Sequence, residues 1–207
     1  MPIEFTSFGK IARLSREVVI TEKIDGSNAA VRVAQMTDVG QDDEFNLLTT
    51  VSAFGIEYGV FAQSRKKMIT ADSDNYGFAK WVIRNAASLV HLGEGIHFGE
   101  WWGNGINAGY GLKEKRFSLF NTHRWNDDTK PDCCSVVPVL ARGLLTDALV
   151  EDAIELLLTK GSQAAPGSRT KPEGIVIYHT PAGTYFKKTL EDDDVGKEES
   201  IRRQEAA

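Results

Sequence analysis

Short runs rich in Val and Ile, separated by turn signals, constrain the fold of this chain more than any other feature. Residues 17–22 and 29–34 are two such runs, and the intervening Asp25-Gly26-Ser27-Asn28 is typical of a tight turn. Neither a regular βαβ alternation nor an internal repeat is present, so we expect mostly antiparallel sheet. Further strands are predicted at residues 45–52, 59–63, 95–101, 116–120, 174–178 and 184–188, with a hairpin turn at 181–183.

Two other segments have the spacing of helices. Residues 74–90 place apolar side chains on one face, and a polar side chain of residues 72–74 can cap the first turn. Residues 146–160 form the clearest helical pattern, with Thr146 as the cap and Gly161 as the stop. Together the segments predict an α+β fold of mostly antiparallel sheets with interspersed helices.

The length and charge of the chain indicate one domain and do not decide its partner. The 207 residues suit a single domain, which we expect at residues 1–190, followed by a polar acidic tail at residues 191–207. A net charge of −5 argues weakly against binding to nucleic-acid phosphates. Part of the acidity is concentrated in the tail and at residues 42–44, however, so the remaining surface can still hold a basic groove.

Several classes of protein are disfavoured by composition. The adjacent Cys133 and Cys134 predict reduced thiols, because neighbouring cysteines rarely form a disulfide and two ligands do not make a zinc site. No apolar run of roughly 18 residues is present, and no secretory signal is visible. We therefore expect a cytoplasmic protein without a membrane partner.

Lys23 lies at the end of the first apolar run and just before the tight turn. A lysine attacks an electrophile only when it is neutral, a form that burial or neighbouring cations favour. A Lys-x-Asp-Gly sequence is common in surface turns, so the motif alone favours an ordinary turn.

Four later segments also contain residues suited to chemistry. Gly99-Glu100-Trp101-Trp102 places a carboxylate among bulky apolar residues, where an acid needs a partner. Phe117-Ser118-Leu119-Phe120 offers an aromatic ring that can stack on a base. Glu173 precedes a buried strand, and Tyr185-Phe186-Lys187-Lys188 brings lysines near the end of the globular part. Each segment alone favours a structural role, but their order is informative.

In order, these segments resemble motifs I, III, IIIa, IV and V of the covalent nucleotidyltransferases, which include ATP-dependent DNA ligases, RNA ligases and mRNA capping enzymes. The resemblance spans roughly residues 17–190. The run Glu22-Lys23-Ile24-Asp25-Gly26-Ser27-Asn28 is most similar to the RNA ligase 2 group, whose first motif continues to an Asn. Residues 62–66 resemble the Ser-Arg segment that follows it in these ligases.

The resemblance implies an ATP-dependent RNA ligase with the nucleotidyltransferase (ligase adenylation) fold. In such ligases a lysine takes AMP from ATP, AMP passes to a 5′-phosphate end, and a 3′-hydroxyl then displaces AMP. The expected substrates are RNA ends or a nicked duplex, and the cofactors are ATP and Mg²⁺ or Mn²⁺. A role in RNA repair would follow from this chemistry.

The resemblance also implies roles for single residues. Lys23 would be the nucleophile, and Lys187 would neutralise the α-phosphate. Glu173 and Glu100 would bind the metal, because Mg²⁺ takes hard oxygen ligands and keeps several waters. Glu100 could instead contact the ribose hydroxyls. Further contacts to ATP are expected from Glu22, Asn28, Arg65 and Phe120, with Phe120 stacking on adenine.

Two features depart from the family pattern. The last motif usually has two lysines separated by one residue, which a strand places on one face. Here Lys187 and Lys188 are adjacent and point oppositely, and we expect Lys187 and Tyr185 to face inward. The chain also leaves no room after Lys188 for an OB domain, so an accessory protein is a possible partner. A minimal DNA ligase, a capping guanylyltransferase and a non-catalytic nucleic-acid-binding relative remain alternatives.

Overall fold

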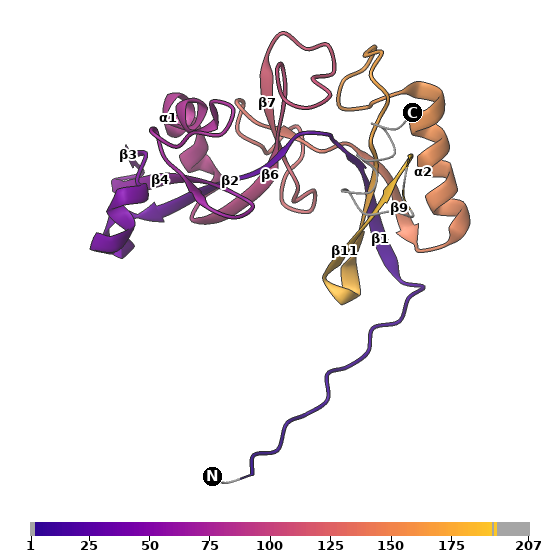
Figure 1. The fold of residues 1–207 in the computed structure, drawn as a ribbon. Coiled ribbons are helices and arrows are strands. Elements are labelled where there is room, and N and C mark those ends of the chain that lie inside the picture. Colours follow the sequence, from indigo (N-terminus) through magenta and orange to yellow (C-terminus); the bar gives the residue numbers. More distant parts are fainter. Residues whose placement is uncertain (1–2, 192, 194–207) are drawn as a thin grey trace, which may run out of the picture.

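A computed structural model describes residues 3–191 and 193, which form two sheets and two α-helices (Figure 1). The helices are α1 (Phe78–Leu89) and α2 (Asp147–Lys160), and short 3₁₀ turns occupy Met36–Asp38, Gln41–Asn46, Val90–Leu92 and Thr180–Ala182. The strands are β1 (Glu17–Lys23), β2 (Ser27–Gln35), β3 (Thr49–Ala53), β4 (Ile56–Ser64), β5 (Met68–Ile69), β6 (Gly95–Gly103), β7 (Lys115–Leu119), β8 (Ser135–Val136), β9 (Val139–Leu144), β10 (Gly174–His179) and β11 (Thr184–Thr189). The predicted α+β class is confirmed. The acidic tail expected at 191–207 lies outside the described residues, apart from Glu191 and Asp193.

The smaller sheet has the strand order β11-β10-β1-β9, with antiparallel neighbours throughout. Helix α2 covers one face, where Leu157 packs with Ile20 and Ile177. Because side chains alternate along a strand, Thr21 and Lys23 of β1 point to the opposite face. That face remains open for a site.

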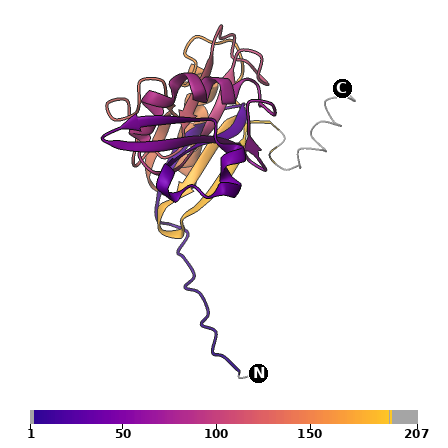
Figure 2. The same ribbon diagram turned by 90° about the vertical axis from the view of Figure 1, so that its left-hand side faces the viewer.

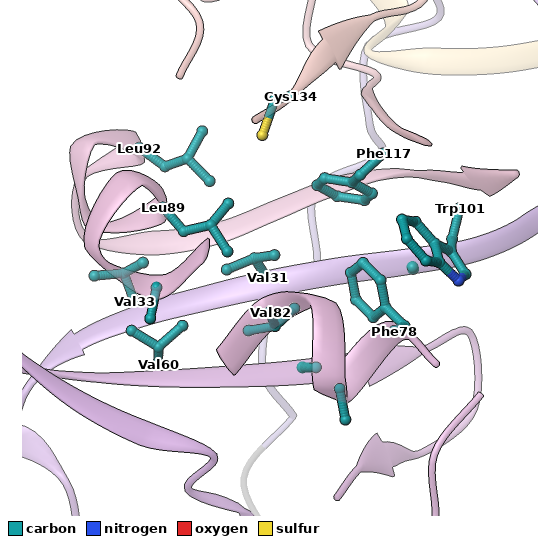
Figure 3. Packing of buried hydrophobic residues seen from close by; sticks show 14 of the residues in the cluster. Val31, Val33, Val60, Phe78, Val82, Leu89, Leu92, Trp101, Phe117 and Cys134 are labelled. Carbon is teal, nitrogen blue, oxygen red and sulfur yellow. The ribbon is translucent and has the colours of Figure 1, made fainter. Parts of the chain in front are cut away.

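The larger sheet has the order β3-β4-β2-β6-β7-β8, and β5 pairs with β4. Its pairs are antiparallel except for β7 and β8. Helix α1 covers one face and forms the main core with it (Figure 3). Burial of this much apolar surface supplies most of the driving force for folding. Its buried residues include Val31, Val33, Val60, Phe78, Val82, Leu89, Trp101 and Phe117.

Two segments join the sheets: residues 24–26 connect β1 to β2, and residues 137–138 connect β8 to β9. In the turned view of Figure 2 the larger sheet lies in front of the smaller one. Gly26 lies in the first segment, close to β6, and a Cβ there would lie 2.7 Å from the Trp101 carbonyl oxygen and 2.7 Å from the Trp102 Cβ. Only glycine fits this position without displacing the neighbouring backbone. The turn predicted after Lys23 is therefore the first of the two junctions between the sheets.

Helix α1 begins at Phe78, so the prediction of a helix from residue 74 was wrong at this end. Tyr76 and Gly77 have φ angles of 51° and 81°, left-handed values that interrupt a helix. Asp74 nevertheless serves the first turn, because its carboxylate accepts a hydrogen bond from the Ala79 N–H at 2.7 Å. Asp74 therefore caps α1 from the far side of the turn at residues 75–77, and not from the residue directly before Phe78.

Two other predictions differ from the structure. The strand expected at 45–52 begins only at Thr49, because Gln41–Asn46 form a 3₁₀ turn. The sequence pattern also missed the short β5 and β8, and it missed β9, which is a half-exposed edge strand with no clear alternation. The cap and stop of α2, Thr146 and Gly161, are confirmed. Among the described helices, none is long and apolar enough to cross a membrane.

Candidate active site

A cleft of about 890 Å³ lies between the open faces of the two sheets. The smaller sheet contributes residues from β1, β10 and β11, and the larger sheet contributes residues from β2, β6 and the segment after β7. Glu173 does not line the cleft, although it contacts a residue that does. The other predicted site residues all line it: Glu22, Lys23, Asn28, Arg65, Glu100, Phe120 and Lys187.

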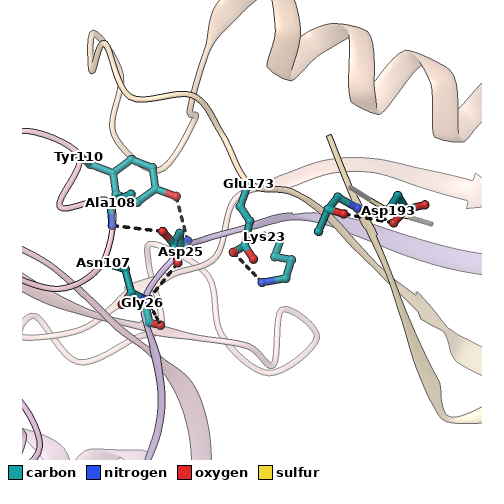
Figure 4. Close-up of polar contacts among 9 residues, drawn as sticks. Lys23, Asp25, Gly26, Asn107, Ala108, Tyr110, Glu173 and Asp193 are labelled. Carbon is teal, nitrogen blue, oxygen red and sulfur yellow. Dashed lines mark hydrogen bonds and ion pairs between the residues drawn. The ribbon is translucent and has the colours of Figure 1, made fainter. Parts of the chain in front are cut away.

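Lys23 ends β1 beside the carboxylate of Glu173. The register of β1 and β10 pairs Lys23 with Gly174, so the residue before Gly174 reaches the lysine side chain. The Lys23 Nζ lies 2.6 Å from the Glu173 Oε2, and the two side chains are only 23% and 30% exposed (Figure 4). This Oε2 is buried and has no other partner among the described residues. The pair therefore fixes the amine at the junction of the sheets.

Glu100 of β6 is the carboxyl group most affected by this cleft. The pKa of Glu100 is raised from 4.5 to about 7, chiefly by burial. The Lys23 charge lowers this pKa, and the Glu173 charge raises it. Arg65 has a smaller lowering effect, and Asp25 a smaller raising one. A carboxyl group poised near neutral pH in a cleft is a common feature of functional sites.

The raised pKa of Glu100 predicts a pH-dependent stability. Between its ordinary pKa of 4.5 and about 7, the folded chain holds a proton that the unfolded chain has lost. The free energy of unfolding therefore falls as pH rises through this window. Glu100→Gln removes the titration, so the wild type should lose about 3 kcal/mol relative to the variant. Urea denaturation at several pH values measures this loss, and equal pH profiles would contradict the raised pKa.

The donor set near Lys23 is compatible with a hard divalent cation. The Glu173 charge raises the pKa of Glu100, and both residues offer carboxylate oxygens. Across residues 3–191 and 193, no group of three or more His, Cys, Asp or Glu side chains could hold a metal. Mg²⁺ or Mn²⁺ that keeps several waters and shares ligands with phosphates fits such a pair, whereas a cage made only of protein ligands does not.

The larger sheet and the segments that follow its strands supply polar and aromatic side chains to the cleft. Asn28 of β2 pairs in register with Glu100, so both side chains point the same way. Arg65 follows β4 directly, is exposed and lines the same space. Phe120 follows β7, where its N–H donates to the Phe98 carbonyl oxygen at 3.0 Å. Its half-buried ring packs against Ile24 and the cluster around it.

The two adjacent lysines of β11 separate onto opposite faces. Lys187 pairs with Val176 of β10, and both line the cleft. Tyr185 lies on the same face, as expected from alternation. Lys188 does not line the cleft, and its Nζ lies 3.2 Å from the Asp193 Oδ2. One lysine of this strand is therefore available to an anion in the cleft.

Glu22 is tied to a distant loop. Its buried carboxylate accepts hydrogen bonds from the Ser162 Oγ at 2.6 Å and from the backbone N–H groups of Gln163 at 2.7 Å and Ala164 at 2.9 Å. Burial raises the pKa of Glu22, and these hydrogen bonds lower it. Glu22, which is expected to contact ATP, thus also anchors the loop between α2 and β10 to the strand of Lys23.

Comparison with known proteins agrees with this arrangement. Residues 16–190 match the RNA ligase family. The chain belongs to the RNA ligase family. The match contains every residue that the sequence assigned to the site, from Glu22 to Lys187. No curated protein sequence matches the chain.

Solved structures of the Naegleria gruberi RNA ligase share the fold of this RNA ligase family member. The structure with PPi is 15% identical, with a TM-score of 0.52, and the match covers 93% of this chain and 53% of that one. A mutant with ATP and Mn is 16% identical, with a TM-score of 0.54, over 86% of this chain and 51% of that one. A mutant with AMP and Mn is 19% identical, with a TM-score of 0.52, over 84% and 49%. The chain therefore spans about half the length of these ligases.

Sequence reasoning missed several residues of this RNA ligase family member that shape the site. Tyr178 lines the cleft, and its ring centroid lies 4.6 Å from that of Tyr185. Ser162 contacts Glu22, and Asn107 and Tyr110 contact the turn after Lys23, although the sequence pattern predicts no role for these three residues. The glycine-rich run from Gly103 to Gly111 was the available signal, because so many glycines indicate unusual backbone geometry.

Proposed function

We propose that this protein is an ATP-dependent RNA ligase in which Lys23 takes AMP from ATP. The observation that carries the proposal is the position of the Lys23 amine. It is only partly exposed, and it lines a nucleotide-sized cleft near the carboxyl groups of Glu173 and Glu100. Lys187, on the edge strand β11 of the smaller sheet, lines the same cleft. Membership of the RNA ligase family supports this reading of the geometry.

The cleft offers complementary surfaces to ATP. Phe120 from the larger sheet and Val176 from the smaller one both line it, and each presents apolar surface to a planar adenine ring. Asn28 and Glu100 can accept or donate hydrogen bonds at the ribose hydroxyls. Arg65 suits a phosphate or the ribose, because its guanidinium is a rigid fork of donors.

In the first step the neutral Lys23 Nζ attacks the α-phosphorus. A nitrogen–phosphorus bond forms, the bond to the bridging oxygen breaks, and pyrophosphate leaves with the electron pair. The proton that the attacking nitrogen loses passes to the departing pyrophosphate or to solvent. Lys187 offsets the negative charge that develops on the α-phosphate oxygens. A divalent cation held by Glu173 and Glu100 would add positive charge beside the phosphates and compete with Lys23 for the carboxylate.

Two further transfers complete the proposed cycle. An oxygen of the 5′-phosphate end attacks the phosphorus of lysine-bound AMP, which frees Lys23. A 3′-hydroxyl then attacks the activated 5′-phosphate, forming a phosphodiester bond and releasing AMP. Structures of the Naegleria gruberi RNA ligase contain ATP with Mn, AMP with Mn, and PPi, the small molecules that such a cycle uses and releases.

The proposal is tested with ATP that is radiolabelled on the α-phosphate. The protein is incubated with this ATP and Mg²⁺ or Mn²⁺, separated under denaturing conditions, and digested to locate the label by mass spectrometry. We expect label on the peptide that contains Lys23. Failure of any label to remain on the denatured protein would overturn the proposal.

The substrate is tested separately, with nicked duplexes that carry RNA or DNA on each side of the nick and with unpaired RNA ends. Joining of RNA ends is the expected result. Joining of DNA alone would favour a DNA ligase, and labelling by GTP in place of ATP would favour a capping enzyme.

A further inference from the structure

The turn that follows Lys23 is held by the loop of residues 104–114, which connects β6 to β7. The Asn107 Nδ2 donates to the Asp25 Oδ1 at 3.0 Å and to the Gly26 carbonyl oxygen at 2.6 Å (Figure 4). The Ala108 N–H donates to the Asp25 Oδ2 at 3.1 Å. The Asp25 N–H in turn donates to the Tyr110 hydroxyl at 2.9 Å. The loop thus contacts the side chain and the backbone of the turn.

Two of these residues adopt left-handed backbone conformations, which tyrosine disfavours more than asparagine does. Asn107 has a φ angle of 42° and Tyr110 one of 51°, both in the left-handed region. A bulky ring at positive φ is uncommon, and such conformations persist only where the surroundings determine them. Here those conformations carry the amide and the hydroxyl onto the turn after Lys23. Strained residues of this kind are concentrated at functional sites.

Packing makes the Tyr110 hydroxyl a fixed point. The ring is only 2% exposed and belongs to the buried cluster that includes Ile24 and Trp102. Its centroid lies 5.1 Å from that of Trp102 in an edge-on arrangement. Because the packing restricts movement of the ring, the hydroxyl is held in place and can fix the position of the Asp25 N–H.

The loop also links the two halves of the site. It begins directly after β6, the strand that contains Glu100. It also contacts the turn that follows Lys23, the last residue of β1. An attacking amine must be held close to the phosphorus and in line with the leaving group, and small displacements lower the rate strongly. A connection between these two segments therefore sets the distance and angle of attack.

We infer that Asn107 and Tyr110 are positioning residues that hold Lys23 in line for attack on the α-phosphate. The inference rests on the proposed function, and it concerns the rate of AMP attachment and not the binding of ATP. Neither side chain lines the cleft, so neither is expected to touch the nucleotide. The inference therefore predicts a separation between the limiting rate and the half-saturating ATP concentration.

Single-turnover AMP attachment over a range of ATP concentrations tests this prediction. Tyr110→Phe removes only the hydroxyl, and Asn107→Ala removes only the amide. We expect each to lower the limiting rate about 10- to 100-fold while the half-saturating ATP concentration changes less than about twofold. Asn107→Gly relieves the backbone strain yet lacks the amide, so it should be slow as well.

Matched controls come from the same region. Asn104→Ala removes an amide of the same loop that donates to the Lys113 carbonyl oxygen at 3.3 Å, and within the described residues this amide makes no hydrogen bond to the turn. Tyr76→Phe removes the hydroxyl of another tyrosine with a φ angle of 51°. Both variants should attach AMP at the wild-type rate. Thermal melts of all variants show how much protein is folded under the assay conditions.

Two outcomes separate this inference from the proposed function. If the wild type takes label and Tyr110→Phe, Asn107→Ala and Asn107→Gly attach AMP at its limiting rate, the positioning role is overturned alone. The same holds if their rates fall only in proportion to the folded fraction. If the wild type takes no label, the proposed function and this inference fall together.

Discussion

Replacement of Lys23 by alanine is expected to abolish AMP attachment, lowering its rate by more than about 10⁴-fold. In the described part of the chain, the Lys23 Nζ lies 2.6 Å from a carboxylate oxygen of Glu173, and no other amine forms an ion pair with that residue. Without the nucleophile, ATP can still bind, but no phosphoramidate can form. The measurement is the radioactivity that remains on denatured protein after incubation with α-labelled ATP.

Two further variants define what the Lys23 experiment means. Lys23→Arg keeps a positive charge but supplies a group that stays protonated, so it should also fail to take label. Lys160→Ala removes the lysine at the end of α2, which does not line the cleft, and should label normally. Labelling of Lys23→Arg at the wild-type rate would assign Lys23 an electrostatic role and place the nucleophile elsewhere.

Lys187→Ala is expected to slow AMP attachment roughly 100- to 1,000-fold, the usual cost of losing one group that stabilises transition-state charge. Lys187 lines the cleft from β11, opposite the larger sheet, and nucleotidyl transfer adds negative charge on the α-phosphate oxygens. The effect should appear in the limiting rate of single-turnover labelling with a smaller change in ATP affinity.

The adjacent lysine is a closely matched control for Lys187. Lys188 has the same side chain on the same strand, but it points to the other face and pairs with Asp193 at 3.2 Å. Because exposed ion pairs contribute little, Lys188→Ala should label within about threefold of the wild-type rate. A large loss in Lys188→Ala with a small one in Lys187→Ala would mean that the other face of β11 meets the nucleotide.

Much of the framework was predictable because it depends on neighbours in the chain. Runs of Val and Ile predicted β1, β2 and β10, and the Thr146 cap predicted the start of α2. Strand alternation alone placed Lys187 and Lys188 on opposite faces. The ordered motifs predicted which side chains meet in the cleft, and all but Glu173 line it.

The start of α1 and the edge strand β9 were not predictable in the same way. Asp74 caps from a distance, because left-handed residues intervene between it and the helix. β9 has weak alternation and becomes a strand by pairing with β1, which lies far from it in the sequence. At β9, this tertiary pairing overrode what the local pattern indicated.

The sequence alone determined the identity and order of the reactive side chains, with Lys23 before a tight turn and the acids and Lys187 following on later strands. Only the tertiary structure decided what holds them: Glu22 against Ser162, the Lys23 amine against Glu173, and the turn against Asn107 and Tyr110. The reason is physical. A hydrogen bond between groups more than 80 residues apart forms only where the whole fold brings them within about 3 Å. The local propensities of the residues do not determine that distance.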